Sequence, residues 1–402
     1  MNHYAPFLSK EGMSGLHVEI ARELRESEIQ VHVIGASTSH PAGRQYAVNG
    51  DLMPVMWEGT RSYWVHAREY LGNGPDRLLN MFDFGRKFRD PKFLRKLPKP
   101  DIIVGRVINP LAAFFCARLA RGIGVPFVLE IADIWPETFI QLGKIRRWGP
   151  PSVILGSLER WLISQADAVM SPLPGLDRYL ADSGFQDKPF YWVPNGVSDD
   201  QDVVPTYDKN PNDPFTVMYF GSMGNANAVD TILKAYAIFV AQSETETRLE
   251  LVGSGPLSSK LKDLAGELGI SSTTVFTDRI PRAELVAFAQ RADVLVANMR
   301  ALDLYKYGIA LNKLFDYLLC SKPVVFGASA LNNLVEDALA GITVPGDNVD
   351  ELALAMKRMQ QLPASQRQKM GESGRTHVLR NYTYRNSAQR FHQMIDDLTD
   401  LD

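Results

Sequence analysis

Between residues 12 and 197, stretches with helical spacing of apolar residues alternate with short runs of β-branched and other apolar residues. Leu16 to Glu26 is amphipathic and predicts a helix, and residues 30–37 predict a strand that closes in a Gly/Ser loop. Strands alternating with helices indicate a parallel, doubly wound sheet. The same alternation predicts further strands at 101–106, 127–133, 168–172 and 190–196, and helices at Leu111–Arg121 and Ile154–Gln165.

The alternation stops at residues 198–213, which are acidic, contain prolines and show no periodicity, as in a linker. Six short strands follow, most of them separated by amphipathic helices. We therefore expect an α/β fold of two doubly wound, Rossmann-like domains, at 1–197 and 214–380, facing a central cleft. Ligands in such sheets lie beyond the carboxyl ends of the strands.

The start of the chain is short for this architecture. Residues 1–7 leave only a few positions before the loop "LSKEGMSG" and the first helix. A complete first strand, which is normally central in such a sheet, does not fit. We expect either that this strand is truncated here or that the natural start lies upstream.

Composition excludes several classes of protein. The chain has 402 residues, 45% hydrophobic and 22% charged, with a net charge of -3, so no overall field attracts nucleic acid and any anion site must be local. Cys116 and Cys320 lie in apolar segments, which predicts buried free thiols in a reducing compartment. No leader, membrane-spanning run or metal-ligand spacing is visible, so we expect a cytoplasmic protein that needs no metal.

The stretch "KYGIALNKLFDYLLCSKPVVFG" (306–327) gathers polar residues at the approach to an apolar helix. We expect Asn312 to cap this helix, with Lys313, Asp316 and Tyr317 on the face opposite its core-facing leucines. A helix start attracts phosphate, Lys313 adds charge, and a carboxylate one turn further can accept from two ribose hydroxyls. The alternative is a surface helix with an ordinary Lys/Asp pair.

Three glycine turns lie where the predicted strands meet helices. Gly221 and Gly224 follow a strand, Gly12 and Gly15 precede the first helix, and residues 251–261 contain a third turn. Such turns let the backbone approach a diphosphate closely. Each alone has a structural alternative, since tight strand-to-helix turns need glycine anyway, but three together strengthen the prediction of a phosphate site.

Cations also follow the predicted strands. Arg279, Arg300 and Lys306 could neutralise charge on a departing diphosphate together with Lys313, although solvated loop residues are the ordinary alternative. Asp133, at the end of a strand in "EIADIWPETF", could bind an acceptor hydroxyl or take its proton, or could merely cap a turn.

Two further features have open interpretations. His3 and His17 lie near strand-end loops without metal-ligand company, and either could be an ordinary packed or surface histidine. Residues 85–99 are basic with interleaved aromatic residues and leucines. This stretch could rest on anionic lipid headgroups or be a solvated basic helix.

Several motifs resemble, in order and spacing, retaining glycosyltransferases of family 4, which have the GT-B fold. The likeness covers nearly the whole chain and is closest to the bacterial O-antigen and capsule branch that includes fucosamine transferases. The motifs are "EIADIWPE" (130–137), "VPNGV" (193–197), "YFGSMG" (219–224), "VGSGP" (252–256) and "YGIALNKLFDYLLCSKPVV" (307–325).

The resemblance implies a UDP-sugar donor bound mainly by the second domain, and residues 381–402 crossing back to the first domain. We expect no metal or other cofactor, because the protein itself supplies the positive charge. Asp316 corresponds to the carboxylate that holds the ribose. By this likeness and the reasoning above, the expected catalytic residues are Asp133, Arg279 and Lys313. The expected substrate-binding residues are Gly12, Gly15, His17, Gly221, Gly224, Arg279, Arg300, Lys306, Asn312, Lys313 and Asp316.

The chain departs from the family pattern at three places. Ala132 stands where many relatives have histidine, Gly308 stands where a paired glutamate is expected, and "SMGNANA" (222–228) replaces the usual arginine and lysine. Phosphate neutralisation is therefore assigned to the cations named above.

The expected activity is retaining transfer of a sugar from a UDP-sugar to a lipid-linked or oligosaccharide acceptor in cell-surface polysaccharide synthesis. We expect the protein in the cytoplasm, with peripheral contact to the inner face of the bacterial membrane through residues 85–99 and no nucleic-acid partner. The alternatives are a nucleotide-sugar epimerase of the same fold and an inactive partner that binds a nucleotide-sugar or scaffolds another transferase.

Overall fold

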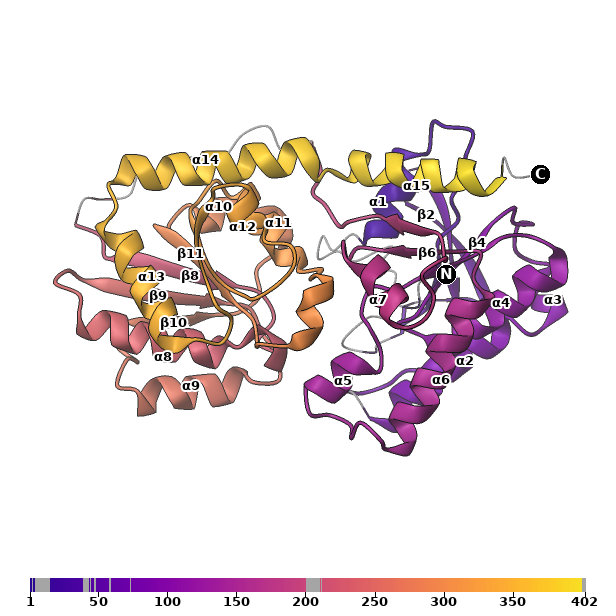
Figure 1. Ribbon diagram of the computed structural model, residues 1–402, viewed down its shortest axis with the longest axis horizontal. Helices are drawn as coiled ribbons and strands as arrows, with labels where there is room; N and C mark the ends of the chain where they lie inside the picture. Colours follow the sequence, from indigo (N-terminus) through magenta and orange to yellow (C-terminus); the bar gives the residue numbers. More distant parts are fainter. Residues whose placement is uncertain are drawn as a thin grey trace. The chain divides into compact units, whose positions relative to one another are not determined.

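The computed structural model divides into two compact units (Figure 1). The first unit comprises Met1–Asn195 with Tyr384–Asp402, and the second comprises Gly196–Thr383. The predicted site residue Gly12 and most of the predicted linker lie outside the described residues. The residues that the structure describes are 1, 3, 15–38, 43, 45–46, 48–57, 59–72, 74–199, 210 and 212–399.

The first unit contains two sheets. A four-stranded, wholly parallel sheet has the order β4-β5-β6-β7, and a three-stranded sheet has the order β1-β3-β2. The strands are β1 (Ile34–Ala36), β2 (Leu52–Trp57), β3 (Thr60–Val65), β4 (Ile103–Arg106), β5 (Phe127–Glu130), β6 (Ala168–Ser171) and β7 (Phe190–Trp192). The helices are α1 (Leu16–Glu23), α2 (Pro75–Lys87), α3 (Pro91–Leu94), α4 (Pro110–Ile123), α5 (Glu137–Gln141), α6 (Pro150–Gln165), α7 (Leu176–Asp182) and α15 (Tyr384–Thr399).

Each strand predicted in this half is present, but the β2–β3 pair was not predicted. These two strands are antiparallel, and β3 also pairs in parallel with β1. Pro54 interrupts β2 and apolar residues do not alternate along it, so the pattern gave no strand signal. Pro54 is tolerated because β2 lies at the edge of its sheet. At the start of the chain, His3 accepts a backbone hydrogen bond from Ala36 of β1.

The second unit contains one six-stranded parallel sheet with the order β10-β9-β8-β11-β12-β13. All six predicted strands are present, and the predicted fold of two Rossmann-like domains is confirmed. The strands are β8 (Phe215–Phe220), β9 (Thr247–Val252), β10 (Thr274–Thr277), β11 (Val294–Asn298), β12 (Val324–Gly327) and β13 (Gly341–Val344). The chain moves outward from β8 in one direction and then returns to β11 on its other side. Ligands in open parallel sheets bind at such a switch point.

Helices cover both faces of this sheet (Figure 1). Along β8, Met218 and Phe220 enter one buried cluster, and Val217 and Tyr219 enter the other. Successive side chains of a strand point to opposite faces of the sheet, so alternate residues of β8 pack into different clusters. The helices are α8 (Val229–Ala241), α9 (Ser258–Glu267), α10 (Arg282–Ala289), α11 (Asn312–Leu319), α12 (Leu334–Asp337), α13 (Val349–Gln361) and α14 (Ala364–Asn381), with 3₁₀ turns η1 (Asn225–Asn227) and η2 (Asp303–Tyr307).

The last helix, α15, belongs to the first unit although it follows the second in sequence. Helices α1 and α15 share a buried apolar cluster. It contains Leu16 and Ile20 of α1, the C-cap residue Leu24, and Ala388 and Phe391 of α15. Cys116 and Cys320 are both free and buried, as predicted. Among the helices that the structure describes, none is long and apolar enough to cross a membrane.

Candidate functional site

The side chain of Lys313 lies at the switch point of the second unit, at the start of α11. Its Nζ donates hydrogen bonds to Tyr219 Oη at 3.1 Å and to Asn227 Oδ1 at 2.7 Å. The same atom lies 4.6 Å from the centroid of the Tyr219 ring. Desolvation lowers the pKa of Lys313 to about 7. Within the described chain no carboxylate pairs with this ammonium group, so its charge is held by neutral oxygens alone.

Two of the predicted glycine turns meet beside Lys313. A Cβ on Gly221 would lie 3.4 Å from Lys313 Nζ, and Gly221 has φ +146°. A Cβ on Gly253 would lie 2.1 Å from Gly221 O, and one on Gly255 would lie 2.5 Å from Met223 O. The turns after β8 and β9 therefore pack backbone against backbone, which only glycine permits. Gly224 lies in the same turn, immediately before η1.

Asp316, one turn after Lys313, forms an ion pair with Arg282 at the start of α10. Arg282 donates from Nη2 at 2.7 Å and from Nε at 3.1 Å, in both cases to Oδ1. Asp316 Oδ2 makes no hydrogen bond within the described part of the chain. Desolvation raises the pKa of Asp316, and the Arg282 charge opposes this rise. The site therefore presents one carboxylate oxygen that is still able to accept hydrogen bonds.

Arg282 was missed because "DRIPRAEL" contains two arginines and Arg279 follows the strand more directly. Arg279 is exposed in the loop between β10 and α10. One local signal could have pointed to Arg282. It follows Pro281, which is the N-cap of α10, so Arg282 is the first residue of that helix. The side chain of a residue in the first turn of a helix points in a defined direction. Only the packing of α10 in the folded protein shows that the Arg282 side chain points to Asp316.

Two predictions about α11 were wrong. Its N-cap is Leu311, with no side-chain capping bond, and Asn312 is its exposed first residue. Tyr317 is fully buried instead of sharing a polar face with Lys313. Its Oη accepts from Phe220 N at 2.9 Å and lies 3.0 Å from Phe220 O and 3.1 Å from Val296 O. The buried arc of α11 is wide enough to include Tyr317 because the hydroxyl finds backbone partners on β8 and β11.

Arg300 and Lys306, two other predicted cations, have partners of their own. Arg300 lies 2.5 Å from Asp230 and 2.8 Å from Asp347, so two carboxylates already balance its charge. The role of Arg300 at a diphosphate stays a prediction. Lys306 is exposed in η2, with its Nζ 4.7 Å from the centroid of the Tyr307 ring.

In the first unit, His17 is engaged by a buried carboxylate. His17 Nε2 lies 2.5 Å from Glu130 Oε2, and Arg106 Nε lies 3.3 Å from Glu130 Oε1. Desolvation raises the pKa of Glu130, but the charges of Arg106 and His17 outweigh it and lower this pKa to about 2. Gly15 is the N-cap of α1, next to His17 in space and sequence. This cluster, which sequence reasoning missed, brings the ends of β4 and β5 together with α1.

Asp133 follows β5, three residues after Glu130; its side chain reaches the surface, but protein atoms surround the rest of its carboxyl group. Desolvation raises the pKa of its carboxyl, and the charge of Arg106 opposes this rise. Asp133 is thus near the cationic edge of the Glu130 cluster, and its part at the acceptor side stays a prediction. Among the described residues, no three His, Cys, Asp or Glu side chains form a group that could hold a metal ion.

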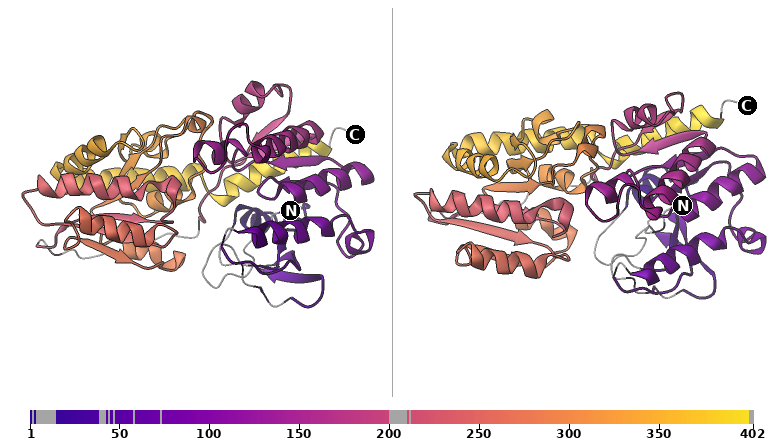
Figure 2. Two further views of the ribbon diagram at one scale, coloured as in Figure 1. Left: turned by 90° about the horizontal axis from the view of Figure 1, so that it is seen from below. Right: turned by 60° about the horizontal axis from the view of Figure 1, so that its bottom comes forward.

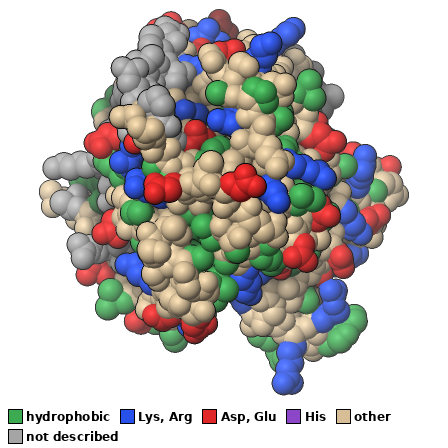
Figure 3. Space-filling model, turned by 90° about the vertical axis from the view of Figure 1, so that its left-hand side faces the viewer, with side chains coloured by type: hydrophobic (Ala, Val, Ile, Leu, Met, Phe, Trp, Pro, Cys, Tyr) green, Lys and Arg blue, Asp and Glu red, His purple; other side chains and the backbone are tan. Residues whose placement is uncertain are grey.

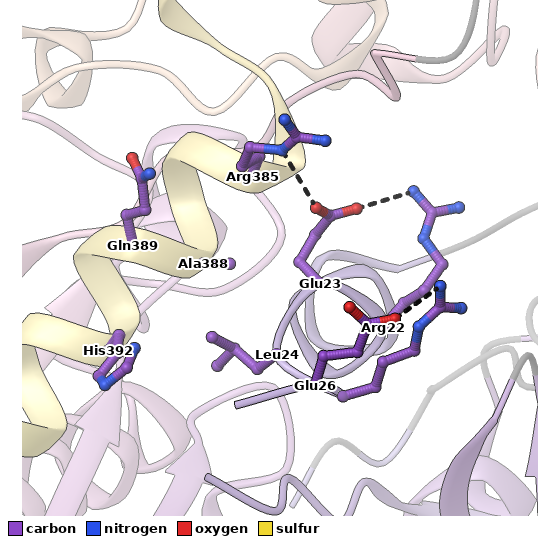
Figure 4. Close-up of a pocket in the computed structure, with 9 residues that line it drawn as sticks. Arg22, Glu23, Leu24, Glu26, Arg385, Ala388, Gln389 and His392 are labelled. Atoms are coloured by element: carbon purple, nitrogen blue, oxygen red, sulfur yellow. Dashed lines mark hydrogen bonds and ion pairs between the residues drawn. The ribbon is translucent and has the colours of Figure 1, made fainter. Parts of the chain in front are cut away.

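A polar groove of about 440 Å³ lies between α1 and α15 in the first unit (Figure 4). Glu23 at its centre pairs with Arg22 at 3.3 Å and with Arg385 at 3.7 Å. Arg25 pairs with Glu26 at 3.6 Å. These charges pair with one another and none of the residues predicted to act lines the groove, so the groove is not the predicted site.

Both halves of the chain match models of glycosyltransferase domains. Residues 12–196 match the glycosyl transferase 4-like domain, and residues 214–361 match the glycosyl transferases group 1. A curated protein of Mycolicibacterium smegmatis is 32% identical over 155 residues, which are 37% of this chain and 40% of that protein. It is named GDP-mannose-dependent alpha-(1-6)-phosphatidylinositol monomannoside mannosyltransferase. The match thus spans less than half the length of that relative.

Solved structures share the fold over nearly the whole chain. Sucrose-phosphate synthase from Thermosynechococcus elongatus superposes with a TM-score of 0.74 at 16% identity, covering 96% of this chain and 92% of that one. Anabaena HepE in complex with UDP-glucose superposes with a TM-score of 0.65 at 14% identity, covering 96% and 97%. The predicted likeness to the O-antigen and capsule branch stays a prediction. The two consecutive matches thus describe both parts of this chain as glycosyltransferase-like domains, and the solved structures share their two-domain fold.

Proposed function

We propose that this glycosyltransferase moves a sugar from a UDP-sugar to a lipid-linked polysaccharide acceptor, with retention of the anomeric configuration. The observation that carries the donor part is the Lys313 ammonium group. It is desolvated, lacks a carboxylate partner within the described chain, and adjoins two glycine turns at the switch point of a parallel sheet. A bound diphosphate would supply the missing negative charge.

In this proposal, Lys313 stabilises charge that grows on the diphosphate as the bond to the sugar breaks. An interaction that strengthens as charge develops lowers the barrier, whereas uniform binding does not. The start of α11 contributes its free N–H groups at the same place. These groups need no metal to balance the leaving group, and Arg279 remains a proposed additional cation from the loop after β10.

Asp316 is proposed to hold the ribose. Its Oδ2 can accept from a ribose hydroxyl while Oδ1 stays paired with Arg282, so ligand binding does not require the ion pair to break. Asp133 is proposed to bind the acceptor hydroxyl or to take its proton. His17 is proposed to act through Glu130 and α1 and not by direct contact, since its Nε2 already pairs with that carboxylate.

Thermal protection and product release test the proposal together. The protein is melted with UDP, with GDP and with a panel of their sugars, and free nucleotide and sugar are then measured. We expect protection by UDP and slow release of UDP from its sugar donor. Protection by GDP alone would contradict the UDP assignment, a new nucleotide-sugar would indicate an epimerase, and protection without release or transfer to any acceptor would indicate an inactive binding partner.

Asp316→Asn gives a matched variant for the same assay, because it keeps the shape of the side chain and removes its charge. We expect UDP protection to fall by about tenfold or more, with the ligand-free melting temperature changed little. Asp263→Asn, on the exposed face of α9, is the control. A large loss of ligand-free stability in Asp316→Asn would instead indicate a structural role.

A further inference from the structure

We propose that the outward surface of the α2, α4 and α6 layer in the first unit rests on an anionic lipid bilayer. This surface, called the helical-layer surface, is formed by residues 71–72, 74–99, 110–123 and 146–161. Its biological purpose rests on the proposed function, since a lipid-linked acceptor is reached from a membrane. Its physical basis is independent, and comes from exposed apolar side chains, charge and the arrangement of the three helices.

Helix α2 presents large apolar side chains to solvent. Leu78 is 69% exposed, Leu79 42% and Phe82 50%, and Leu71 just before the helix is 84% exposed. Residues 78, 79 and 82 share one face by helical spacing. The opposite face carries Phe84, which is fully buried. The core is therefore satisfied by the inner face, and nothing within the described chain covers the outer one.

The same layer continues across α4 to α6. Helix α4 packs against both α2 and α6, and the three lie side by side in the left view of Figure 2. At the far side, Trp148 is 87% exposed, Val153 53% and Ile154 65%. Exposed apolar residues thus occur on both outer helices of one layer and in the segment just before α6. A flat lipid surface can contact such separated side chains together, each entering the headgroup region on its own.

Cations outnumber carboxylates on this layer, although Lys87 pairs with Asp51 and Arg86 with Asp83. Residues 71–99 contain eight Lys and Arg against three Asp, in a chain whose net charge is -3. One of these aspartates, Asp83, is buried and pairs with Arg68 and Arg86. Helix α4 adds the exposed Arg118 and Arg121 and has no acidic residue. By contrast, acidic and basic side chains are interspersed on the face shown in Figure 3.

The carboxylate of α6 does not weaken this positive surface. Glu159 is buried, and Tyr179 donates a hydrogen bond to it at 2.7 Å. Exposed leucine, phenylalanine and tryptophan side chains beside a surplus of arginine and lysine are the composition that binds anionic lipid interfaces. The chemistry thus selects phosphate-bearing lipid headgroups over a neutral bilayer.

The membrane contact predicted for residues 85–99 needs correction in its apolar part. Phe88 is 2% exposed and Phe93 3%, and both enter a buried cluster with Phe84. The aromatic residues of this stretch therefore face the core, and only its cations remain for lipid. The apolar contact comes instead from α2 and from the start of α6, which the pattern of residues 85–99 did not indicate.

Vesicle sedimentation tests the proposal with the full chain. We expect the protein to sediment with vesicles of phosphatidylcholine and phosphatidylglycerol, to sediment much less with phosphatidylcholine alone, and to be released by salt. Leu78→Ser with Phe82→Ser should weaken binding by about tenfold or more, since both side chains are exposed and their loss spares the core. Leu331→Ser with Leu354→Ser, two positions of equal 40% exposure in the second unit, is the matched control.

UDP protection of the same variants separates this inference from the proposed function. Vesicle binding unaffected by the α2 substitutions, or absent altogether while UDP still protects, would overturn the helical-layer surface and leave the donor site standing. Vesicle binding without any nucleotide protection would overturn the donor site alone. If the α2 substitutions abolished self-association and not vesicle binding, the surface would be a protein interface and the lipid proposal would be wrong.

Discussion

The guanidinium group of Arg282 lies 2.7 Å from the carboxylate of Asp316, so this carboxylate has a charged partner before any ligand arrives. Both side chains stay partly accessible, at 31% for Arg282 and 19% for Asp316. Desolvation favours the neutral carboxylic acid, and the adjacent cation favours the carboxylate. Arg282 is therefore a positioning residue that helps to keep Asp316 ionised.

Substituting Arg282 by glutamine should make nucleotide binding sensitive to acid. Without the guanidinium, the already raised pKa of Asp316 rises further, so more of the carboxylate is protonated as the pH falls. We expect UDP affinity in Arg282→Gln to drop by several-fold more than in the wild type between about pH 8 and about pH 5. Titration calorimetry measures this, with the exposed Arg358→Gln as control. Equal pH profiles in the two proteins would contradict the assigned role.

Replacing Lys313 by methionine should stabilise the empty protein while removing donor binding. Burial lowers the pKa of Lys313 from its ordinary value of 10.5 to about 7, so between these two pH values the unfolded chain binds a proton that the folded protein lacks. The wild type should therefore gain stability as the pH rises through this window, and Lys313→Met should lack this contribution. Urea unfolding at several pH values measures the difference. Lys357→Met, at a helix surface, should behave like the wild type.

Donor binding should be accompanied by proton uptake above neutral pH. A diphosphate beside Lys313 raises its pKa from about 7, so binding above that pH requires protonation and the affinity should fall as the pH rises. A UDP-sugar is the suitable probe because its diphosphate has no group that titrates in this range. Calorimetry in two buffers of different ionisation enthalpy reports the uptake. Affinity that increases with pH would exclude Lys313 as the anion-binding group.

Glu159 should make the first unit less stable at alkaline pH. Burial raises its pKa from 4.5 to about 8, so the folded protein holds a proton that the unfolded chain releases between these values. The wild type should lose on the order of a few kcal/mol across this window, whereas Glu159→Gln should not. Denaturant unfolding at about pH 5 and about pH 9 compares them, with the exposed Glu267→Gln as control. An equal loss in both proteins would show that Glu159 does not titrate in this way.

The strands and the glycine turns were predictable because their signals are local. A parallel strand buried on both faces is a short apolar run, and a glycine at its end marks a turn, as at Gly221 and Gly253. Lys313 could be placed at a helix start from its neighbours alone. Local order along the chain thus identified the carboxyl edge of the second sheet and the cation beside it.

The contacts that complete the site depend on distant segments and could not be read in this way. Arg282 and Asp316 are 34 residues apart in the sequence, and His17 and Glu130 are 113 residues apart. Helical spacing placed Tyr317 on the polar face because a hydroxyl suggests solvent, whereas its partners are backbone atoms of β8 and β11. Strand β2 gave no signal because an edge strand tolerates proline and irregular alternation.

The buried hydroxyl of Tyr317 joins α11 to two neighbouring strands at the point where the sheet changes direction. Lys313 lies one helical turn before Tyr317, and Asp316 lies one residue before it. Any tilt of α11 would therefore have to break the hydrogen bonds of the Tyr317 hydroxyl to β8 and β11. The groups proposed to recognise the diphosphate and the ribose are consequently held in a stiff framework. We therefore expect Lys313 and Asp316 to keep their positions when a sugar nucleotide binds. Any change of conformation on binding should occur in the surrounding loops.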